Sequence, residues 1–383
     1  MASAATAPKQ GLRSRTAESV VVELLSRAGV TVGGDAAHDV EVRDRRFYAR
    51  LLRDGALGMG ESYMEGWWDS PALDQMLVRI VRAKLEREVR TNPRLAAQAI
   101  AARVVNMQRR SRATHVAKHH YDANDDVYAA MLDADRIYSC GYWREADALE
   151  AAQQAKLDLV CRKLGLREGM TVLDIGCGWG GFAKFAAERY GVRVTATNIA
   201  AGQVEYARRA CAGLDVEIRL EDYRDTRGSF DAIVSVGMFE HVGFKNYGAF
   251  METVERCLSV DGVALLHTIA GNLPSVGGPW IKKYIFPNGH LPTLAQIAQA
   301  SEGLLVIEDV HNFGPDYDRT LMEWDRRFES AWPTLAGNYD ERFRRMWRYY
   351  LLSSAAGFRS RNIQLFQVAL TRTGAPSPDA RQV

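Results

Sequence analysis

The pattern that most suggests chemistry is a set of alternating glycines after a short apolar segment. Residues 172–175 are typical of a buried strand, and Gly176, Gly178 and Gly180 follow it. Glycines let the backbone approach a ligand closely, and a helix that begins after them offers unpaired N–H groups to an anion. The third glycine comes too early for the dinucleotide fingerprint, and Asp174 lies inside the strand. The turn therefore predicts a ligand site of another kind, with a plain strand–helix turn as the less favoured alternative.

Polar side chains stand at the corresponding places of the later strands. Thr197 and Asn198 end the second expected strand, Asp222 follows the third, Glu240 follows the fourth, and His267 ends the fifth. Open α/β sheets bind ligands at the carboxyl ends of their strands, which favours one shared site. Structural alternatives remain, because Asp222 fits a loop cap or ion pair about equally well, and His267 could be a core histidine.

The elements that must position these side chains alternate between helix and strand after residue 148. Apolar periodicity predicts helices at residues 149–164, at 182–190, from about 203 and from about 247. It predicts strands at residues 172–175, 192–197, 216–220, 230–236 and 262–268, and we expect residues 363–371 to close the sheet. Such alternation implies an α/β fold in which helices cover both faces of a parallel sheet.

The first part of the chain has a different character and is mostly helical. We expect helices at residues 17–28 and 72–84, and a turn-rich packed segment rather than one long helix at residues 58–68. The predicted organisation is a disordered N-terminus at 1–15, a helical domain with its linker at 16–112, a larger domain at 113–372 and a disordered tail at 373–383.

Residues 89–121 contain several arginines and no acidic residue, the sharpest charge asymmetry in the chain. A solvated linker and a surface for anionic lipid headgroups explain this run about equally well. RNA binding is less favoured, because aromatic residues are not interleaved through it.

Composition excludes several other classes. The 383 residues carry a net charge of +2 and are 47% hydrophobic and 25% charged, which is typical of a globular protein without a nucleic-acid partner. Five cysteines without a Cys-x-x-Cys pair predict neither a disulfide framework nor a metal site, and favour a reducing, cytoplasmic compartment. No signal peptide is evident, and no window approaches the ~20 apolar residues that cross a bilayer. Membrane contact is therefore expected to be peripheral, at the inner face.

The strand, Asp174 and the glycine turn together resemble motif I of the class I methyltransferases. That resemblance implies a Rossmann-like sheet beside the smaller, mostly helical N-terminal domain, and a turn that holds the amino-acid end of S-adenosylmethionine. Where this fold usually has an acid for the ribose hydroxyls, the chain has Thr197 and Asn198, and Asp222 stands where the fold meets the adenine amino group. The implied cofactor contacts are Tyr138, Ser139, Asp174, Gly176, Gly178, Gly180, Thr197, Asn198, Gln203, Asp222 and Tyr223.

Further segments narrow the resemblance. From about residue 45 to 372, the chain resembles the cyclopropane-fatty-acyl-phospholipid synthases, which add a methylene bridge to unsaturated acyl chains of membrane lipids. The segments that carry it are residues 58–68, His120-Tyr121-Asp122, residues 138–143, the glycine turn, residues 236–243, Leu266-His267-Thr268-Ile269, residues 284–289 and residues 311–317. Several motifs that match in order are far more specific than any one of them.

The chemistry of that family places demands on the site. An alkene is a poor nucleophile, so the methyl group must be held close and in line, and a base must then remove a proton so that the ring can close. The resemblance implies that bound bicarbonate is this base, held by Cys140, Glu240, His267, Ile269 and Tyr317. His267 and the Tyr317 hydroxyl can donate to an anion, Glu240 would orient His267 or accept the bicarbonate proton, and Cys140 and Ile269 would contribute their backbone. A Cys140 nucleophile is disfavoured, because methyl transfer to carbon needs no covalent enzyme intermediate.

The resemblance also implies binding partners, and the chain departs from the family pattern at a few positions. It implies a substrate of membrane phospholipid with unsaturated acyl chains, docking through the N-terminal domain, an acyl pocket covered by residues 272–292, and a homodimer. Asn198 and Ala200 replace a usual Thr-x-Ser, and Asn124-Asp125-Asp126 replaces Gly-Asn-Asp, which affects cofactor contacts rather than the bicarbonate ligands. Methylation of a small amine, synthesis of a methyl-branched lipid, and a catalytically silent lipid-binding protein remain as alternatives.

Overall fold

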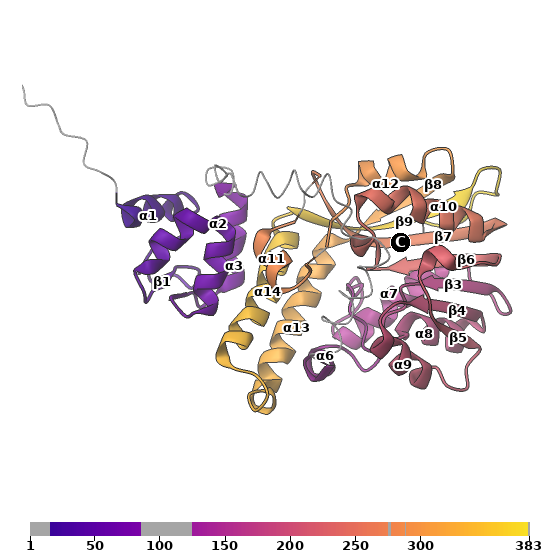
Figure 1. Cartoon of the computed structure of the whole chain (residues 1–383), viewed down its shortest axis with the longest axis horizontal. Coiled ribbons are helices and arrows are strands. Elements are labelled where there is room, and N and C mark those ends of the chain that lie inside the picture. The colour runs from indigo at the N-terminus through magenta and orange to yellow at the C-terminus, as the bar shows by residue number, and fades with distance from the viewer. Residues whose placement is uncertain (1–15, 86–124, 275–276, 288, 382–383) are drawn as a thin grey trace, which may run out of the picture.

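The chain forms a helical domain, a pair of long helices and an α/β domain, arranged along one axis (Figure 1). The structure is a computed structural model that describes residues 16–85, 125–274, 277–287 and 289–381. The disorder expected at residues 1–15 and the acid-free run at residues 89–121 lie outside the described residues.

The helical N-terminal domain is built from three helices and one small sheet. Its helices are α1 (Ala17–Arg27), α2 (Arg46–Met64) and α3 (Leu73–Arg82), and the strands β1 (Glu41–Val42) and β2 (Trp68–Asp69) pair antiparallel. The helices predicted at residues 17–28 and 72–84 are therefore confirmed.

The turn-rich segment predicted at residues 58–68 is wrong for most of its length, because residues 58–64 continue α2. The glycines there serve close packing rather than a turn: a Cβ on Gly60 would overlap the Trp280 ring. The real irregularity in α2 comes earlier, at Gly55, whose φ is 56°. Trp68 is fully buried and its Nε1 donates to Ser62 Oγ at 3.0 Å, so this tryptophan belongs to the core.

Seven strands form the sheet of the second domain, in the order β5-β4-β3-β6-β7-β9-β8. The strands are β3 (Thr171–Ile175), β4 (Arg193–Asn198), β5 (Val216–Leu220), β6 (Phe230–Val236), β7 (Leu258–Gly271), β8 (Leu305–Asn312) and β9 (Ile363–Arg372). Strands β3 to β7 run parallel, β9 is antiparallel to β7, and β8 is antiparallel to β9. The predicted Rossmann-like fold is confirmed.

The edge of the sheet differs from the prediction in one respect. Residues 363–371 do form a strand, but β9 lies inside the sheet and β8 forms the edge. Strand β8 was not predicted because its side chains do not alternate cleanly: Glu308 and Asp309 are consecutive acids, and a register shift separates Ile307 from Asp309.

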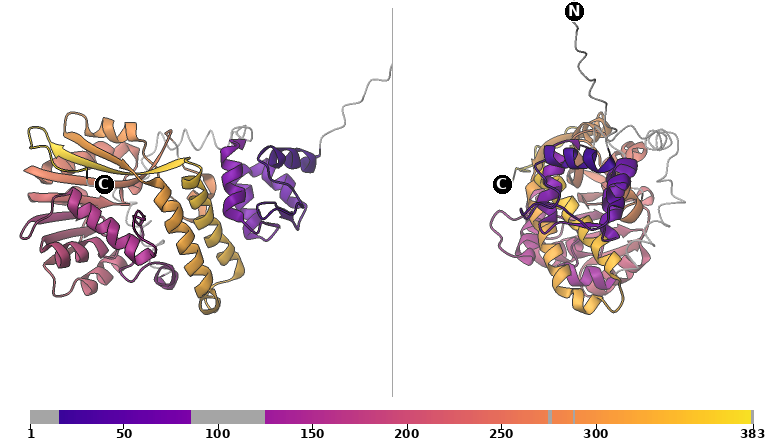
Figure 2. Two further views of the ribbon diagram at one scale, coloured as in Figure 1. Left: turned by 180° about the vertical axis from the view of Figure 1, so that it is seen from behind. Right: turned by 90° about the vertical axis from the view of Figure 1, so that its left-hand side faces the viewer.

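Helices cover both faces of the sheet (Figure 2). One face packs against α7 (Leu149–Lys163), α8 (Gly181–Tyr190) and α9 (Ala201–Ala210), and the other against α10 (Tyr247–Cys257) and α12 (Leu294–Ser301). Shorter elements are α6 (Asp125–Met131), α11 (Pro279–Tyr284), η2 (Tyr223–Asp225), η3 (Phe239–His241) and η4 (Phe244–Asn246). The predicted two-faced arrangement is confirmed.

Two long helices, α13 (Gly314–Leu335) and α14 (Glu341–Arg359), pack together between the sheet and the N-terminal domain (Figure 1). Helix α14 contacts α2 and α3, and α11 contacts α2. The aromatic side chains of this region join the helical domain and the helix pair in one buried core.

The structure describes the tail at residues 373–383, which is predicted to be disordered, as far as Arg381. Ala380 is buried, and Arg381 Nε lies 3.2 Å from Asp309 Oδ1 on β8. This contact could not be predicted from the sequence, because the tail has few apolar residues. Within the described ranges, no helix is both long and apolar enough to cross a membrane.

Candidate active site

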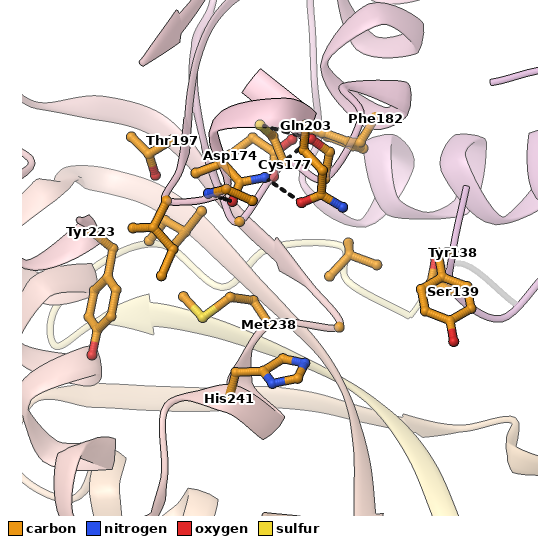
Figure 3. Close-up of a pocket in the computed structure, with 18 of the residues that line it drawn as sticks. Tyr138, Ser139, Asp174, Cys177, Phe182, Thr197, Gln203, Tyr223, Met238 and His241 are labelled. Carbon is orange, nitrogen blue, oxygen red and sulfur yellow. Dashed lines mark hydrogen bonds between the residues drawn. The ribbon is translucent and has the colours of Figure 1, made fainter. Parts of the chain in front are cut away.

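A pocket opens at the carboxyl ends of β3, β4 and β6, where the strand-end polar residues were expected to meet. Figure 3 shows Met238 and His241 facing Asp174 and Gln203 across it, with Tyr223 at one side. Of the predicted cofactor contacts, Tyr138, Ser139, Asp174, Gly176, Gly178, Thr197, Asn198, Gln203, Asp222 and Tyr223 line this pocket. The structure therefore brings together residues from segments that are far apart in the chain.

Gly180 is the predicted contact that does not line the pocket. It precedes α8 with φ 90°, and a Cβ there would lie 3.1 Å from Ala207 Cβ and 3.3 Å from Cys211 Sγ. Its role is therefore to let α8 pack closely against α9. Gly176 and Gly178 also have positive φ, 85° and 55°, and they form the turn at the ligand side.

Two buried charged groups lie at the base of the pocket. Burial raises the pKa of Asp174 to about 7, with Lys156 acting in the opposite direction, and Asp174 Oδ2 has no hydrogen-bond partner among the described residues. Burial lowers the pKa of Lys156 to about 8, and its Nζ donates to Ser139 Oγ at 3.0 Å. Sequence patterns did not identify Lys156, because a buried lysine in an amphipathic helix looks like a surface one.

Asn198 braces the glycine turn. Its Nδ2 donates to Gln203 Oε1 at 2.9 Å and to the Gly178 carbonyl at 3.2 Å, and its Oδ1 accepts from Ala200 N at 3.1 Å. The departure from Thr-x-Ser therefore has a structural role, in which Asn198 links the turn to the start of α9.

Asp222 combines the two interpretations that the sequence left open. Its Oδ1 accepts from Arg224 N at 3.1 Å, and its carboxylate pairs with the Arg224 guanidinium, as a loop cap and ion pair would. Asp222 also lines the pocket. A second departure, Asp125, pairs with Arg136, another lining residue, so the extra negative charge has a cationic partner.

The residues predicted to hold bicarbonate lie beside the pocket rather than in its lining. Glu240 is in η3, between the lining residues Met238 and His241. Its Oε1 accepts from Ile269 N at 2.7 Å, so that backbone donor is already engaged. Glu240 Oε2 is buried without a partner in the described parts of the chain, and burial raises the pKa of Glu240 to about 7.

His267 is buried on β7, with its ring 5.6 Å from the Phe313 ring. Its Nδ1 lies 3.3 Å from Gln367 Nε2, and its Nε2 has no partner among the residues described. Burial holds the pKa of His267 well below its usual value, so the ring is neutral at pH 7. The predicted role of Glu240 in orienting His267 is wrong for this structure, because Gln367 supplies the hydrogen bond to that ring.

Cys140 approaches helix α13, and Tyr317 is a residue of that helix. Cys140 Sγ donates to the Gly141 carbonyl at 3.1 Å and lies 3.9 Å from Thr320 Oγ1, while the Tyr317 ring stacks on Phe358 with centroids 4.7 Å apart. Burial raises the pKa of the Cys140 thiol well above its usual value. A neutral thiol is a poor nucleophile, which agrees with the prediction that Cys140 forms no covalent intermediate.

Comparison with known proteins identifies the family. Residues 108–368 match the family described as mycolic acid cyclopropane synthetase. The chain is also 51% identical over 351 residues to a cyclopropane-fatty-acyl-phospholipid synthase of Escherichia coli strain K12, which covers 91% of this chain and 92% of that protein. This chain belongs to the cyclopropane synthase family.

Two solved cyclopropane synthases have a similar fold. The cyclopropane synthase MmaA2 from Mycobacterium tuberculosis has a TM-score of 0.63 and 31% identity, covering 68% of this chain and 98% of that one. The mycolic acid cyclopropane synthase CmaA1, complexed with SAH and CTAB, has a TM-score of 0.64 and 31% identity over the same shares. These similarities agree with the class I S-adenosylmethionine-dependent methyltransferase fold of the second domain.

The pocket of this member of the cyclopropane synthase family also has lining residues that the sequence did not name as cofactor contacts. They are Arg136, Ile137, Lys156, Leu157, Cys177, Trp179, Phe182, Ile199, Ala200, Met238, His241, Val242, Asn246, Phe286 and Pro287, with others of the strand ends. Met238, His241 and Val242 lie within the family segment 236–243, and Phe286 and Pro287 within 284–289, so membership of such a segment is the signal that could have found them. No group of His, Cys, Asp and Glu in the described chain could hold a metal ion, and all five cysteines are buried and free.

Proposed function

We propose that this chain transfers a methylene group from S-adenosylmethionine to a cis double bond in a phospholipid acyl chain, producing a cyclopropane ring. The observation that carries the proposal is the position of two buried polar atoms, Glu240 Oε2 and His267 Nε2, which have no partner among the described residues and lie on elements next to a class I methyl-donor pocket. A relative with the printed name cyclopropane-fatty-acyl-phospholipid synthase, 51% identical over most of the chain, supports the same reaction.

The pocket residues fit S-adenosylmethionine. When bound, this group supplies an activated methyl. Glycines at 176 and 178 allow close approach of the backbone, and Asp174 Oδ2 is a buried acceptor that lacks a partner within the described residues. Ser139 and Lys156 add polar groups at the base of the pocket. These side chains would bind and orient the donor, so that positioning supplies much of the rate.

The second set of residues fits an anion. Bicarbonate, when bound, would supply the proton acceptor for ring closure. Because the pKa of Glu240 is raised to about 7, this carboxyl group is partly protonated at neutral pH and can donate from Oε2. The neutral His267 ring can donate from Nε2. Both unpartnered atoms would then gain a hydrogen bond, which removes a desolvation cost of about 1–3 kcal/mol each.

The lipid side of the proposal rests on apolar side chains near the pocket. Phe286 and Pro287 line it, and Leu273 and Phe244 are exposed apolar side chains in neighbouring segments, at 68% and 38%. We propose that residues 272–292 cover the acyl chain and that the protein docks peripherally on the inner face of a phospholipid membrane. Attraction between the basic run at residues 89–121 and anionic headgroups would make docking weaker at high salt. A homodimer and the absence of a nucleic-acid partner also remain proposals.

Purified protein, S-adenosylmethionine and vesicles of unsaturated phospholipid test the reaction. We expect each reacted double bond to gain one CH₂ by mass spectrometry and to show the high-field ring protons of cyclopropane by NMR. The NMR measurement is needed because an exomethylene product has the same mass. Removal of bicarbonate from the buffer should slow the reaction, and its return should restore the rate.

Three results would contradict the proposal. Unchanged vesicles, with donor binding confirmed by calorimetry, would favour a silent lipid-binding protein. Turnover on a soluble amine but not on vesicles would favour an amine methyltransferase. A branched product without ring protons would favour synthesis of a methyl-branched lipid.

A further inference from the structure

Three polar residues form a row across the last strands of the sheet. In the antiparallel pairing of β7 with β9, His267 is opposite Gln367, and in the pairing of β9 with β8, Gln367 is opposite His311. Directly opposed residues of antiparallel strands project from the same face. Gln367 therefore stands between the two histidines on the face that α7 covers, where Lys163 Nζ lies 3.2 Å from His311 Nδ1.

The hydrogen bonds along this row have a defined direction. A lysine ammonium can only donate, so Lys163 makes His311 Nδ1 an acceptor. Gln367 is 1% exposed, and its amide nitrogen Nε2 lies 3.3 Å from His267 Nδ1, while its Oε1 has no partner among the described residues. In this orientation of the amide Gln367 donates, so His267 Nδ1 accepts and the proton of the neutral ring resides on Nε2.

We propose that Gln367 is a positioning residue that holds His267 in the tautomer with its proton on Nε2, so that His267 donates to the bound anion. This inference rests on the proposed function, because the anion is the bicarbonate of that mechanism. His267 Nε2 is buried and has no partner among the described residues, which is what a donor reserved for a ligand requires. With the opposite tautomer, Nε2 would carry a lone pair and could not donate to the oxygens of the anion.

The surroundings keep the ring neutral, as a tautomer mechanism requires. The charged and titratable groups that act on His267 are Lys156 and Lys163 from α7 and His311 from β8. All three disfavour a positive charge on the His267 ring. Burial acts in the same direction and is the largest cause of the lowered pKa of His267. Glu240, the acid nearest in the proposed anion site, bonds Ile269 rather than His267.

The experiment compares Gln367→Leu and Gln367→Glu with the full-length wild-type protein. Gln364→Leu is the matched control, because Gln364 is a buried glutamine of the same strand whose partners are Asn272, Arg361 and Asn312 rather than His267. Long-range ¹⁵N–¹H NMR of ¹⁵N-histidine-labelled protein reports which His267 nitrogen carries the proton, and His267→Gln assigns the signal. Kinetics with added bicarbonate give its half-saturating concentration and kcat, and calorimetry gives donor affinity.

We expect the wild type to show a protonated Nε2. Gln367→Leu should show a mixture of tautomers, and its half-saturating bicarbonate concentration should rise about tenfold, the loss expected for one oriented hydrogen bond to an ion. Gln367→Glu, with the same shape, should move a proton to Nδ1, because its carboxylate accepts. Donor affinity and the KM for vesicles should stay unchanged in both variants, and Gln364→Leu should match the wild type in all of these.

An unchanged His267 signal in both Gln367 variants would overturn the inference, as would an unchanged bicarbonate requirement in an enzyme that needs bicarbonate. If Gln367→Leu does not fold, the NMR signal of Gln367→Glu decides. If the wild type needs no bicarbonate, the proposed anion is wrong, and the NMR comparison still shows whether Gln367 sets the tautomer.

Discussion

At the scale of single residues, this site depends on buried groups whose charge is suppressed. Burial raises the pKa values of Glu240 and Asp174 to about 7 and lowers that of Lys156 to about 8. Each would be a poor choice for stability alone, because a buried ionisable group carries a desolvation cost. Their position at the methyl-donor pocket and beside it indicates a functional reason for that cost.

The variant Glu240→Gln should change how stability depends on pH. Below pH 4.5, the unfolded and folded states both hold the Glu240 proton; between 4.5 and about 7 only the folded state keeps it, so wild-type stability falls as pH rises. The variant lacks this loss. Its stability relative to wild type should therefore rise by about 2 to 3 kcal/mol between pH 4.5 and pH 7.5. Urea unfolding at both pH values measures the difference.

Glu217→Gln provides the control for that measurement. Its carboxyl group is exposed, and the side-chain hydrogen bond from Arg219 lowers its pKa. Replacing it should produce only a small change, in the opposite direction. A Glu240→Gln difference that stays constant with pH would show that burial does not hold the proton on Glu240.

The variant Lys156→Met should weaken binding of S-adenosylhomocysteine. Lys156 opposes the upward pKa shift of Asp174 and donates to Ser139 Oγ, so its loss leaves Asp174 more protonated at pH 7 and a poorer acceptor. We expect about a tenfold weaker affinity, the loss of about one charge-assisted hydrogen bond. Calorimetry should find a smaller deficit at pH 9, where Asp174 is ionised again. A deficit independent of pH would mean that Lys156 acts through packing alone.

At the scale of elements, the glycine turn shows that two helices can pack closely only where the residue between them has no side chain. Gly180 has a φ of 90°, and a Cβ added to it would lie 3.1 Å from Ala207 Cβ, so a side chain there would be strained and would also push α9 away from α8. The sequence placed Gly180 among the cofactor contacts because its spacing matches the turn. Whether a glycine faces a ligand or a helix depends on tertiary packing, which no local pattern contains.

The variant Gly180→Ala tests this packing role. Strain at positive φ and overpacking together should lower stability by about 2 kcal/mol. Gly165→Ala is the matched control, because Gly165 has φ 61° but no atom within 4 Å of a Cβ; it should lose about 1 kcal/mol from backbone strain alone. Thermal unfolding measures both. Equal losses would show that the contact with α9 costs nothing.

At the scale of the whole molecule, the sequence predicted the sheet better than the connections between its parts. The βαβ alternation predicted strands β3 to β7 and their covering helices, because short connections leave few topologies. It could not predict that α2 continues through a glycine-rich segment, where the Trp280 ring packs so closely on Gly60 that a Cβ there would overlap it. For the same reason the sequence did not identify Gln367, because its position opposite His267 depends on the register between β7 and β9. Long-range contacts of this kind are absent from any local pattern.

Arg345 of α14 adds a buried polar network to the apolar packing between the N-terminal domain and the rest of the molecule. Its Nε donates to the Tyr63 carbonyl at 2.5 Å, its Nη2 to the Trp68 carbonyl at 2.9 Å, and its Nη1 pairs with Asp69 at 3.0 Å. The Arg345 side chain is 13% exposed, so these acceptors would stay desolvated without it. Loss of a buried cation from such a network costs about 3 kcal/mol.

The variant Arg345→Met should therefore weaken the contact between the N-terminal domain and α14. Because the two parts share one buried apolar core, we expect calorimetry to show one thermal transition at a lower temperature than in the wild type. Arg342→Met is the control: Arg342 also crosses this contact, to Glu65 at 2.9 Å, but both side chains are almost half exposed, and such a pair contributes less than about 1 kcal/mol. A single unshifted transition in Arg345→Met would mean that apolar packing of α14 against α2 and α3 is sufficient, and that the buried arginine network is not what joins the domains.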